Sequence, residues 1–284
     1  MGLRINTNVP SLVAQRNLRN TRVSLDRSLE RLSSGSRINH AGDDAAGLAI
    51  SESLRAQTRG LAQAERNAQD GVSLVQVAES AMGEVSNLLI RMRELGVQAA
   101  SDTIGNQERK FIDVEFQQLL QEVDRIANST EFNRVPLLNG GAHVFEIQVG
   151  TGNNPLTDRI KIFDGSSADI NTTALGLNLA AVGDKASAQQ SLSVIDSALT
   201  SVTSIRAEFG ATQNRLQSVI NNIMISRENL SAANSRIRDT DIAEETAELT
   251  KSQILMQAGV SVLGQANTAL KSALQILGGQ GGGG

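Results

Sequence analysis

Residues 195–237 read IDSALTSVTSIRAEFGATQNRLQSVINNIMISRENLSAANSRI, and every seventh residue of this stretch is a large apolar one. The series runs Ile195, Val202, Phe209, Leu216, Ile223, Leu230 and Ile237 without a break. A seven-residue apolar period places these side chains on one side of a helix, where they face a partner helix. The stretch therefore predicts a long helix with coiled-coil packing.

A second apolar period follows toward the C-terminus. Its members are Ile242, Leu249, Met256, Leu263, Leu270 and Leu277. The register changes at residues 238–241, Arg-Asp-Thr-Asp, where Asp and Thr can cap the start of a new helix. We therefore expect two successive helices with a joint between them.

The first half of the chain has the same periodicity. Apolar residues recur at Leu54, Leu61, Ala68, Val75, Met82 and Leu89, and a shorter series follows a break near residues 101–106: Ile112, Phe116, Leu119, Val123 and Ile126. Closer to the N-terminus, one stripe contains Leu18, Leu25, Leu29 and Leu32 and ends at residues 33–36. A loop over 37–44 then leads to the next helix, with Asp43 or Asp44 near its start.

Only residues 138–184 break this pattern. Phe145, Ile147 and Val149 alternate with more polar residues, as do Ile160 and Ile162 beyond a Gly- and Asn-rich turn at 150–155. Alternation with period two predicts a β-hairpin, followed here by a Gly-, Ser- and Asn-rich loop. The expected fold is mainly α, a long antiparallel coiled-coil or helical-bundle rod with a small β-hairpin insert.

Composition excludes several classes of protein. The 26 Lys and Arg against 30 Asp and Glu give a net charge of -4, which excludes a generic nucleic-acid binder. The chain has no Cys and two His, and it lacks the phosphate-binding loop, the paired-His zinc motif and the nucleophile elbow. The acidic pairs Asp43-Asp44 and Asp239/Asp241 fit helix caps better than metal or acid–base sites. We expect neither enzymatic activity nor a cofactor or metal.

Membrane insertion and a conventional signal peptide are not expected either. No apolar run reaches about 18 residues, and the N-terminal sequence MGLRINTNVPSLVAQRN has no basic segment followed by an apolar one.

Several motifs resemble those of the bacterial flagellin family. They are LSSGSRINHAGDDAAGLAI at 32–50, NAQDG at 67–71, RELGVQ at 93–98, TEFN at 130–133, QNRL at 213–216, ENLSAANSRI at 228–237 and SQILMQAG at 252–259. Together the resemblance covers about residues 1–163 and 190–277. It implies a structural subunit that polymerises into the flagellar filament for swimming motility.

The resemblance also implies a division of the chain. It gives an inner-core helix at 1–36, a linker and outer helices at 37–139, the hairpin and surface loop at 140–185, an outer helix at 186–237, an inner-core helix at 238–277 and a flexible Gly-rich tail at 278–284. The expected inner-core assembly residues are Leu18, Leu25, Leu29, Leu32, Leu249, Met256, Leu263, Leu270 and Leu277. The expected outer-domain core residues are Leu61, Val75, Met82, Leu89, Ile195, Val202, Phe209, Leu216 and Ile223.

Partners and location follow from the same resemblance. Members of the family are exported unfolded by the flagellar type III apparatus, with a chaperone on the C-terminal segment, here about 246–277. The implied location is the extracellular filament, beside its cap and the hook-associated junction proteins. Many flagellins are recognised by Toll-like receptor 5 through residues that match Arg91, Leu95 and Glu115, although Leu119 replaces a basic residue of that pattern. The other interpretation of these three residues is ordinary solvated or inter-subunit contacts.

Three departures from the family pattern stand out. Arg134 replaces the usual Gly, the outer variable region is short, and the chain ends in a glycine tail. Two alternative functions remain open from the residues: a hook-filament junction protein and a generic coiled-coil interaction rod. A catalytic outer domain, which some flagellins carry, is disfavoured because only about 45 residues are available there.

The terminal segments also suggest how the subunit assembles. Two helices rich in Ala offer each other little apolar area against the conformational entropy that ordering them removes. We therefore expect both ends to be disordered in the free subunit and to fold on assembly with neighbouring copies.

Overall fold

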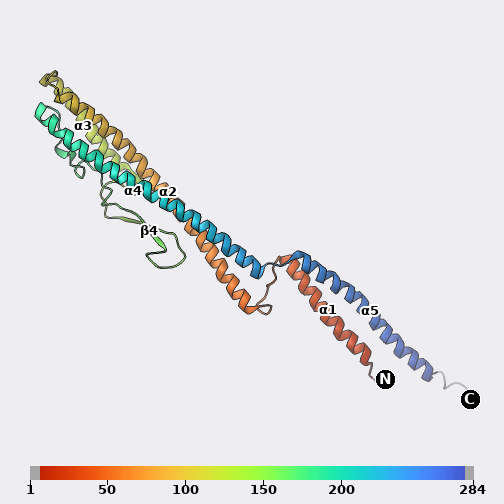
Figure 1. The fold of residues 1–284 in the computed structure, drawn as a ribbon. Helices are drawn as coiled ribbons and strands as arrows, with labels where there is room; N and C mark the ends of the chain where they lie inside the picture. Colours follow the sequence, from red (N-terminus) through yellow and green to blue (C-terminus); the bar gives the residue numbers. More distant parts are fainter. Residues whose placement is uncertain (1–6, 279–284) are drawn as a thin grey trace, which may run out of the picture. The chain divides into compact units, whose positions relative to one another are not determined.

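The computed structural model describes the backbone of residues 7–278 and the side chains of residues 7–268. Its elements are α1 (Val9–Ser34), α2 (Ala45–Ala100), α3 (Asn106–Ser129), β1 (Glu131–Phe132), β2 (Val135–Pro136), β3 (Val144–Gln148), β4 (Arg159–Asp164), the 3-10 helix η1 (Leu177–Leu179), α4 (Lys185–Arg238) and α5 (Ile242–Gly278) (Figure 1). The prediction of a mainly α fold of antiparallel helices with a β-hairpin insert is confirmed. The helix breaks expected near 101–106 and 238–241 are both present.

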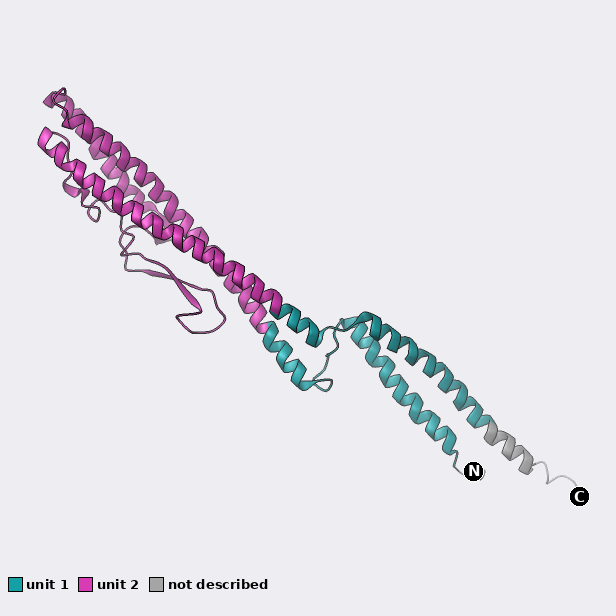
Figure 2. Cartoon of the chain, in the orientation of Figure 1, with its two compact units in different colours: residues 1–55, 230–284 teal, residues 56–229 magenta. Residues whose placement is uncertain are grey.

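The chain forms two compact units, shown in different colours in Figure 2. Unit 1 contains residues 1–55 and 230–284, and unit 2 contains residues 56–229. The division falls within α2 and within α4. None of the described helices is long and apolar enough to cross a membrane.

Unit 1 is built on an antiparallel pair of helices, α1 and α5. Asn8 lies near Ala266, Leu18 near Gly259, and Arg31 near Glu245, so the two helices run in opposite directions. The buried and half-buried residues of both helices recur at alternating spacings of three and four. On α1 they are Ser11, Ala14, Leu18, Thr21, Leu25, Ser28 and Leu32, with Arg31 half-buried beside them, and on α5 they are Glu245, Leu249, Ser252, Met256, Gly259, Leu263 and Ala266. This spacing is the heptad pattern of a coiled-coil seam.

Unit 2 has a continuous apolar core to which α2, α3, α4 and the β3–β4 hairpin contribute. The hairpin is antiparallel and pairs Ile147 with Ile160, which confirms the predicted hairpin. Phe163 of β4 lies between Phe145, with ring centroids 4.7 Å apart, and Phe209 of α4, at 5.1 Å. The hairpin thereby packs its aromatic side chains onto the helices.

Two features of unit 2 differ from the sequence-based expectation. Residues 131–136 form a second hairpin, β1–β2, in which Glu131 pairs with Pro136. The stretch after β4 is not simply a surface loop, because Ile170, Leu177 and Val182 are buried in the core. Polar side chains on α3 hold this stretch in place.

Three side chains of α3 make these contacts. Asp124 accepts hydrogen bonds from the backbone N–H of Thr172 at 2.8 Å and from its hydroxyl at 2.9 Å. Asp113 accepts from the N–H of Val182 at 2.9 Å, and Gln117 donates to the carbonyl of Ala180 at 3.2 Å. Composition alone did not reveal this stretch, because its few apolar residues are separated by Gly, Ser and Asn.

Candidate assembly surface

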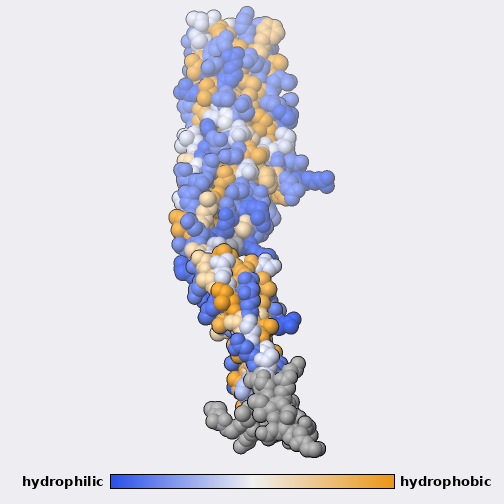
Figure 3. All heavy atoms as spheres, turned by 90° about the vertical axis from the view of Figure 1, so that its right-hand side faces the viewer, coloured by the Kyte–Doolittle hydropathy of each residue, from blue (hydrophilic) through white to orange (hydrophobic). Residues whose placement is uncertain are grey.

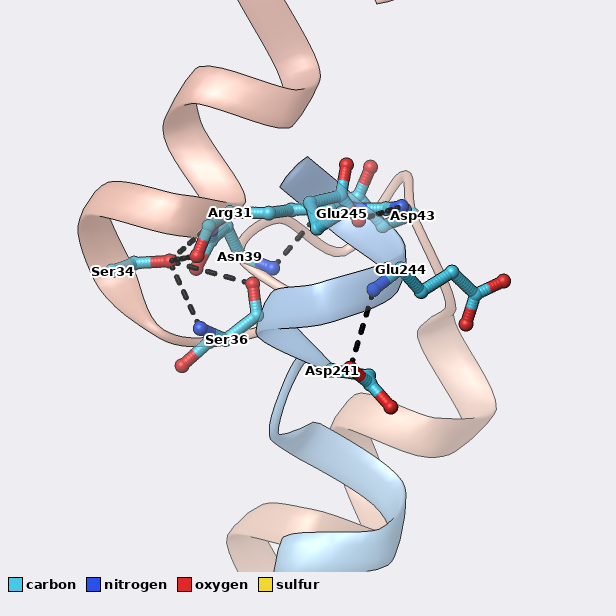
Figure 4. A network of polar contacts seen from close by, with 8 residues as sticks. All are labelled: Arg31, Ser34, Ser36, Asn39, Asp43, Asp241, Glu244 and Glu245. Atoms are coloured by element: carbon cyan, nitrogen blue, oxygen red, sulfur yellow. Dashed lines mark hydrogen bonds and ion pairs between the residues drawn. The ribbon is translucent and has the colours of Figure 1, made fainter. Parts of the chain in front are cut away.

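The joint in unit 1 is organised by short polar side chains in two chain segments (Figure 4). Gly35 ends α1 with a φ of 68°, which suits a residue without a Cβ. The Ser34 hydroxyl accepts hydrogen bonds from Ser36 N at 3.1 Å and from Asn39 Nδ2 at 2.9 Å. Ser36 also forms an antiparallel bridge with Asp239. The loop after α1 is therefore tied to the segment between α4 and α5.

Backbone and charged groups reinforce the joint. The N–H of Arg37 donates to the carbonyl of Arg238 at 2.6 Å. Arg238 also pairs with Glu52 at 2.6 Å, and the hydrogen bond from this guanidinium lowers the pKa of Glu52 below its ordinary value. The end of α4 is thereby fixed to the first part of α2.

One aspartate at the start of α2 and one at the start of α5 act as the predicted caps. Asp44 accepts a hydrogen bond from Gly47 N at 2.8 Å, and Asp241 accepts from Ala243 N at 2.8 Å and from Glu244 N at 3.2 Å. Of the two candidates Asp43 and Asp44, the cap is Asp44; the carboxylate of Asp43 instead accepts hydrogen bonds from the backbone N–H groups of His40 and Asn39 inside the loop. These two hydrogen bonds lower the pKa of Asp43. Among the described residues, no group of three or more His, Asp or Glu is placed to hold a metal ion.

Polar contacts at both ends of the α1–α5 seam set its register. At one end, Arg31 and Glu245 form an ion pair at 3.5 Å, with Glu245 only 9% exposed. At the other end, Asn8 donates to the carbonyl of Ala266 at 3.1 Å, and Ser11 donates to Asn267 Oδ1 at 3.2 Å. A shift of one heptad would separate all of these partners, so the contacts specify one alignment of the helices.

The α1–α5 pair exposes much of its bulky apolar surface, whereas small residues occupy many positions of its seam. The exposed side chains, each at least 40% accessible, are Val9, Leu12, Val13, Val23 and Leu29 on α1 and Ile242, Ile254, Leu255, Val260 and Val262 on α5. Figure 3 shows hydrophobic patches between the hydrophilic ones on one face of the molecule. Exposed apolar surface of this extent is typical of a protein-interaction site. We call these ten side chains the outward apolar set.

Most of the predicted inner-core residues lie in the seam. Leu18, Leu25, Leu32, Leu249, Met256 and Leu263 are half-buried there. Leu29 does not lie in it and is 48% exposed, because the heptad places Ser28 at the seam position. The small members of the seam have no hydropathy signal in the sequence, because Ser and Gly are common on exposed helix faces as well. The side chains of Leu270 and Leu277 lie outside the described residues.

The predicted outer-domain residues lie in unit 2. Leu61 is half-buried, and the others are buried: Val75, Met82, Leu89, Ile195, Val202, Phe209, Leu216 and Ile223. Of the predicted receptor-contact residues, Arg91 and Glu115 are exposed and form an ion pair at 2.8 Å between α2 and α3. Leu95 is only 2% exposed. The structure thus brings Arg91 and Glu115 together on the surface and places Leu95 in the core.

A seam of two antiparallel terminal helices, with bulky apolar residues on its outside, is typical of a helical protein that associates through its terminal helices. Comparison with known proteins identifies the family. Residues 5–142 match the model of the bacterial flagellin N-terminal helical region, and residues 192–277 match that of the C-terminal helical region. The chain belongs to the bacterial flagellin family.

Individual relatives agree with this assignment. A flagellin of Halalkalibacterium halodurans is 44% identical over 273 residues, covering 96% of this chain and 99% of the relative. The flagellar filament 33 kDa core protein of Treponema phagedenis is 42% identical over 288 residues, with 96% and 99% coverage. The solved structure of a putative flagellar hook-associated protein from Vibrio parahaemolyticus has a TM-score of 0.55 at 16% identity, over 69% of this chain and 100% of that one. That likeness shows a common fold only.

The two family models and the two relatives together show that the protein is a structural subunit of the flagellar filament.

Proposed function

We propose that the α1–α5 pair carries subunit assembly and forms the inner core of the filament, with unit 2 in the surrounding layer. The observation that supports this most directly is the outward apolar set. One copy of the chain leaves these side chains in water, and neighbouring copies would bury them at about 25 cal/mol per Å² of apolar surface. Identical head-to-tail contacts of this kind generate an open helical polymer.

We further propose that unit 1 orders only on assembly. Its seam contains Ser11, Ala14, Ser28, Ser252 and Gly259, which bury little apolar area against the entropy of ordering two long helices. Unit 2 has its own large core and would remain folded in the free subunit. The seam leucines and Met256 would then act together with neighbouring copies, and so would Leu270 and Leu277.

Circular dichroism of the purified chain before and after polymerisation tests this coupling. We expect a gain in helix on polymerisation, and we expect hydrogen exchange in the free subunit to be fast in α1 and α5 but slow in the core of unit 2. Equal helix content in both states, with slow exchange in α1 and α5 of the free subunit, would contradict the proposal.

Export as an unfolded chain is proposed on the same basis. The segment 246–277 would bind a flagellar export chaperone, because its exposed residues Ile254, Leu255, Val260 and Val262 would otherwise self-associate. The chain would reach the extracellular filament through the type III apparatus. Replacing Ile254 and Leu255 with Ser should weaken chaperone binding in calorimetric titration, and unchanged binding would place the contact elsewhere.

The remaining partners follow from a filament subunit. We propose contacts with the filament cap at the growing end and with hook-associated junction proteins at the base. The role is mechanical, and no catalytic activity is proposed.

Recognition by Toll-like receptor 5 is proposed for the surface around the Arg91–Glu115 pair. Leu95, at 2% exposure, would support this surface from the core and make no direct contact. A receptor reporter assay on the monomeric chain tests it. Arg91→Ala should reduce signalling, whereas Arg125→Ala, at an exposed arginine paired with Glu122, should not. Equal signalling by both variants would leave Arg91 as an ordinary structural contact.

A further inference from the structure

The turn of the β1–β2 hairpin has an unfavourable backbone for its sequence. The two residues between the strands, Asn133 and Arg134, have φ values of 50° and 64°. Positive φ at both central residues is the geometry of a type I′ turn, which strongly favours Asn followed by Gly. Asn tolerates the left-handed region, but the Cβ of an arginine is crowded there. Glycine would therefore suit position 134 of this turn better than arginine does.

The side chain of Arg134 has no ion-pair partner among the residues that the structure describes. Arg134 is exposed, and among the described residues it takes part in none of the ion pairs or side-chain hydrogen bonds. Five of the other ten arginines of unit 2 are paired with acids: Arg91, Arg93, Arg125, Arg206 and Arg227. Arg134 is thus a free cation at the tip of a tight, strained turn, where a side chain is well presented to another molecule.

The charge composition of unit 2 indicates what kind of group would bind this cation. Residues 56–229 contain 14 Lys and Arg against 20 Asp and Glu, a net charge of -6. Copies that pack side by side in a filament therefore bring like-charged surfaces together, which is unfavourable unless cations reach across. Most of the arginines of unit 2 are already used internally, so free ones such as Arg134 are available for this role.

We propose that Arg134 binds a carboxylate on unit 2 of a neighbouring copy in the filament. The proposal rests on filament assembly by this chain and names one residue that supports it. Local strain that serves a function is a recurrent reason for a residue to occupy a disfavoured conformation. Here the strained turn is already present in the isolated subunit, whereas the favourable contact of the Arg134 side chain forms only between subunits.

The test compares the critical concentration for seeded filament growth of the full chain and its variants at low and at high salt. Arg134→Gln keeps the Cβ but removes the charge. It should raise the critical concentration about two- to five-fold at low salt, the range for an exposed ion pair, and less at high salt. Arg134→Lys should assemble like the unsubstituted chain. Arg125→Gln is the matched control, because it removes one exposed positive charge that is already paired with Glu122.

A fourth variant separates folding from assembly. Arg134→Gly should relieve the turn, so the urea midpoint of unit 2 should be no lower than in the unsubstituted subunit, while the critical concentration rises as in Arg134→Gln. Assembly of the Gln and Gly variants at the unsubstituted concentration would overturn the proposal, and so would an equal rise in Arg125→Gln. Absence of filament growth by the unsubstituted chain would overturn filament assembly itself.

Discussion

Leu18 of α1 lies against Gly259 of α5 so closely that a Cβ added at Gly259 would be 2.7 Å from Leu18 Cδ2 and 3.1 Å from Leu18 Cγ. A real Cβ does not sit this near to another carbon atom, so the helices approach here because residue 259 has no side chain. Large and small residues oppose each other at this point of the seam, and this determines how close the two helices can lie.

Gly259→Ala should therefore destabilise the α1–α5 pair. Alanine favours a helix over glycine by about 1 kcal/mol, but overpacking at the seam costs about 1–3 kcal/mol. Gly264→Ala is the control, because a Cβ added at Gly264 would have no neighbouring atom within 4 Å. We expect the thermal dissociation temperature of filaments to fall in Gly259→Ala and to stay equal or rise in Gly264→Ala. A rise in both variants would show that the close approach does not persist in the filament.

The start of α5 depends on a single carboxylate. Asp241→Ala removes the acceptor for Ala243 N and Glu244 N and should cost about 0.5–2 kcal/mol of helix stability. Asp239→Ala should cost less, because Asp239 contributes its backbone to the bridge with Ser36. Hydrogen exchange at residues 242–246 in assembled filaments measures the difference. Similar exchange rates in the two variants would contradict the capping role.

Two phenylalanines on α3 provide a test of the core of unit 2. Phe116 is fully buried and Phe111 is 67% exposed. Phe116→Ala should lower the free energy of unfolding by about 3–5 kcal/mol, and Phe111→Ala by less than about 0.5 kcal/mol. Urea unfolding of the free subunit, followed by circular dichroism, checks both values. A large effect at Phe111 would mean that this face is covered in the free subunit.

Acid should weaken unit 2 through Asp102. Lys185 donates a hydrogen bond to Asp102 at 2.7 Å and lowers the pKa of this carboxyl below its ordinary value of 3.8. A carboxyl whose pKa is depressed in the folded state contributes stability above its unfolded pKa and loses that contribution as pH falls through the folded value. The difference in urea midpoint between the unsubstituted chain and Asp102→Asn should therefore be present at pH 7 and shrink below about pH 4. A difference that is constant with pH would contradict the ion-pair account.

The sequence predicted the elements well where burial follows a simple period. The heptad from Ile195 to Ile223 corresponds to buried positions on α4, and the alternation at Phe145, Ile147 and Val149 lies on the β3–β4 hairpin. Both patterns involve residues close together in the sequence, so they can be recognised without knowledge of the fold.

The assembly surface was harder to predict from the sequence. Its seam includes Ser11, Ser28, Ser252 and Gly259, which hydropathy alone does not identify as buried. Leu29, a predicted inner-core assembly residue, lies outside the seam and belongs to the outward apolar set. The packing of Ile170 and Leu177 depends on acceptors such as Asp124, which lies 48 residues before Thr172. Contacts between such distant residues have no periodic signal in the sequence.

Electron microscopy of the purified full chain, seeded with short filament fragments, is the most direct test of the central claim that this chain elongates a filament by repeated self-association. The account predicts long helical filaments that extend from the seeds. Seeds that are capped but fail to elongate would indicate a junction protein, and seeds that remain unchanged would indicate a helical protein that does not polymerise. Either of these two results would contradict the account.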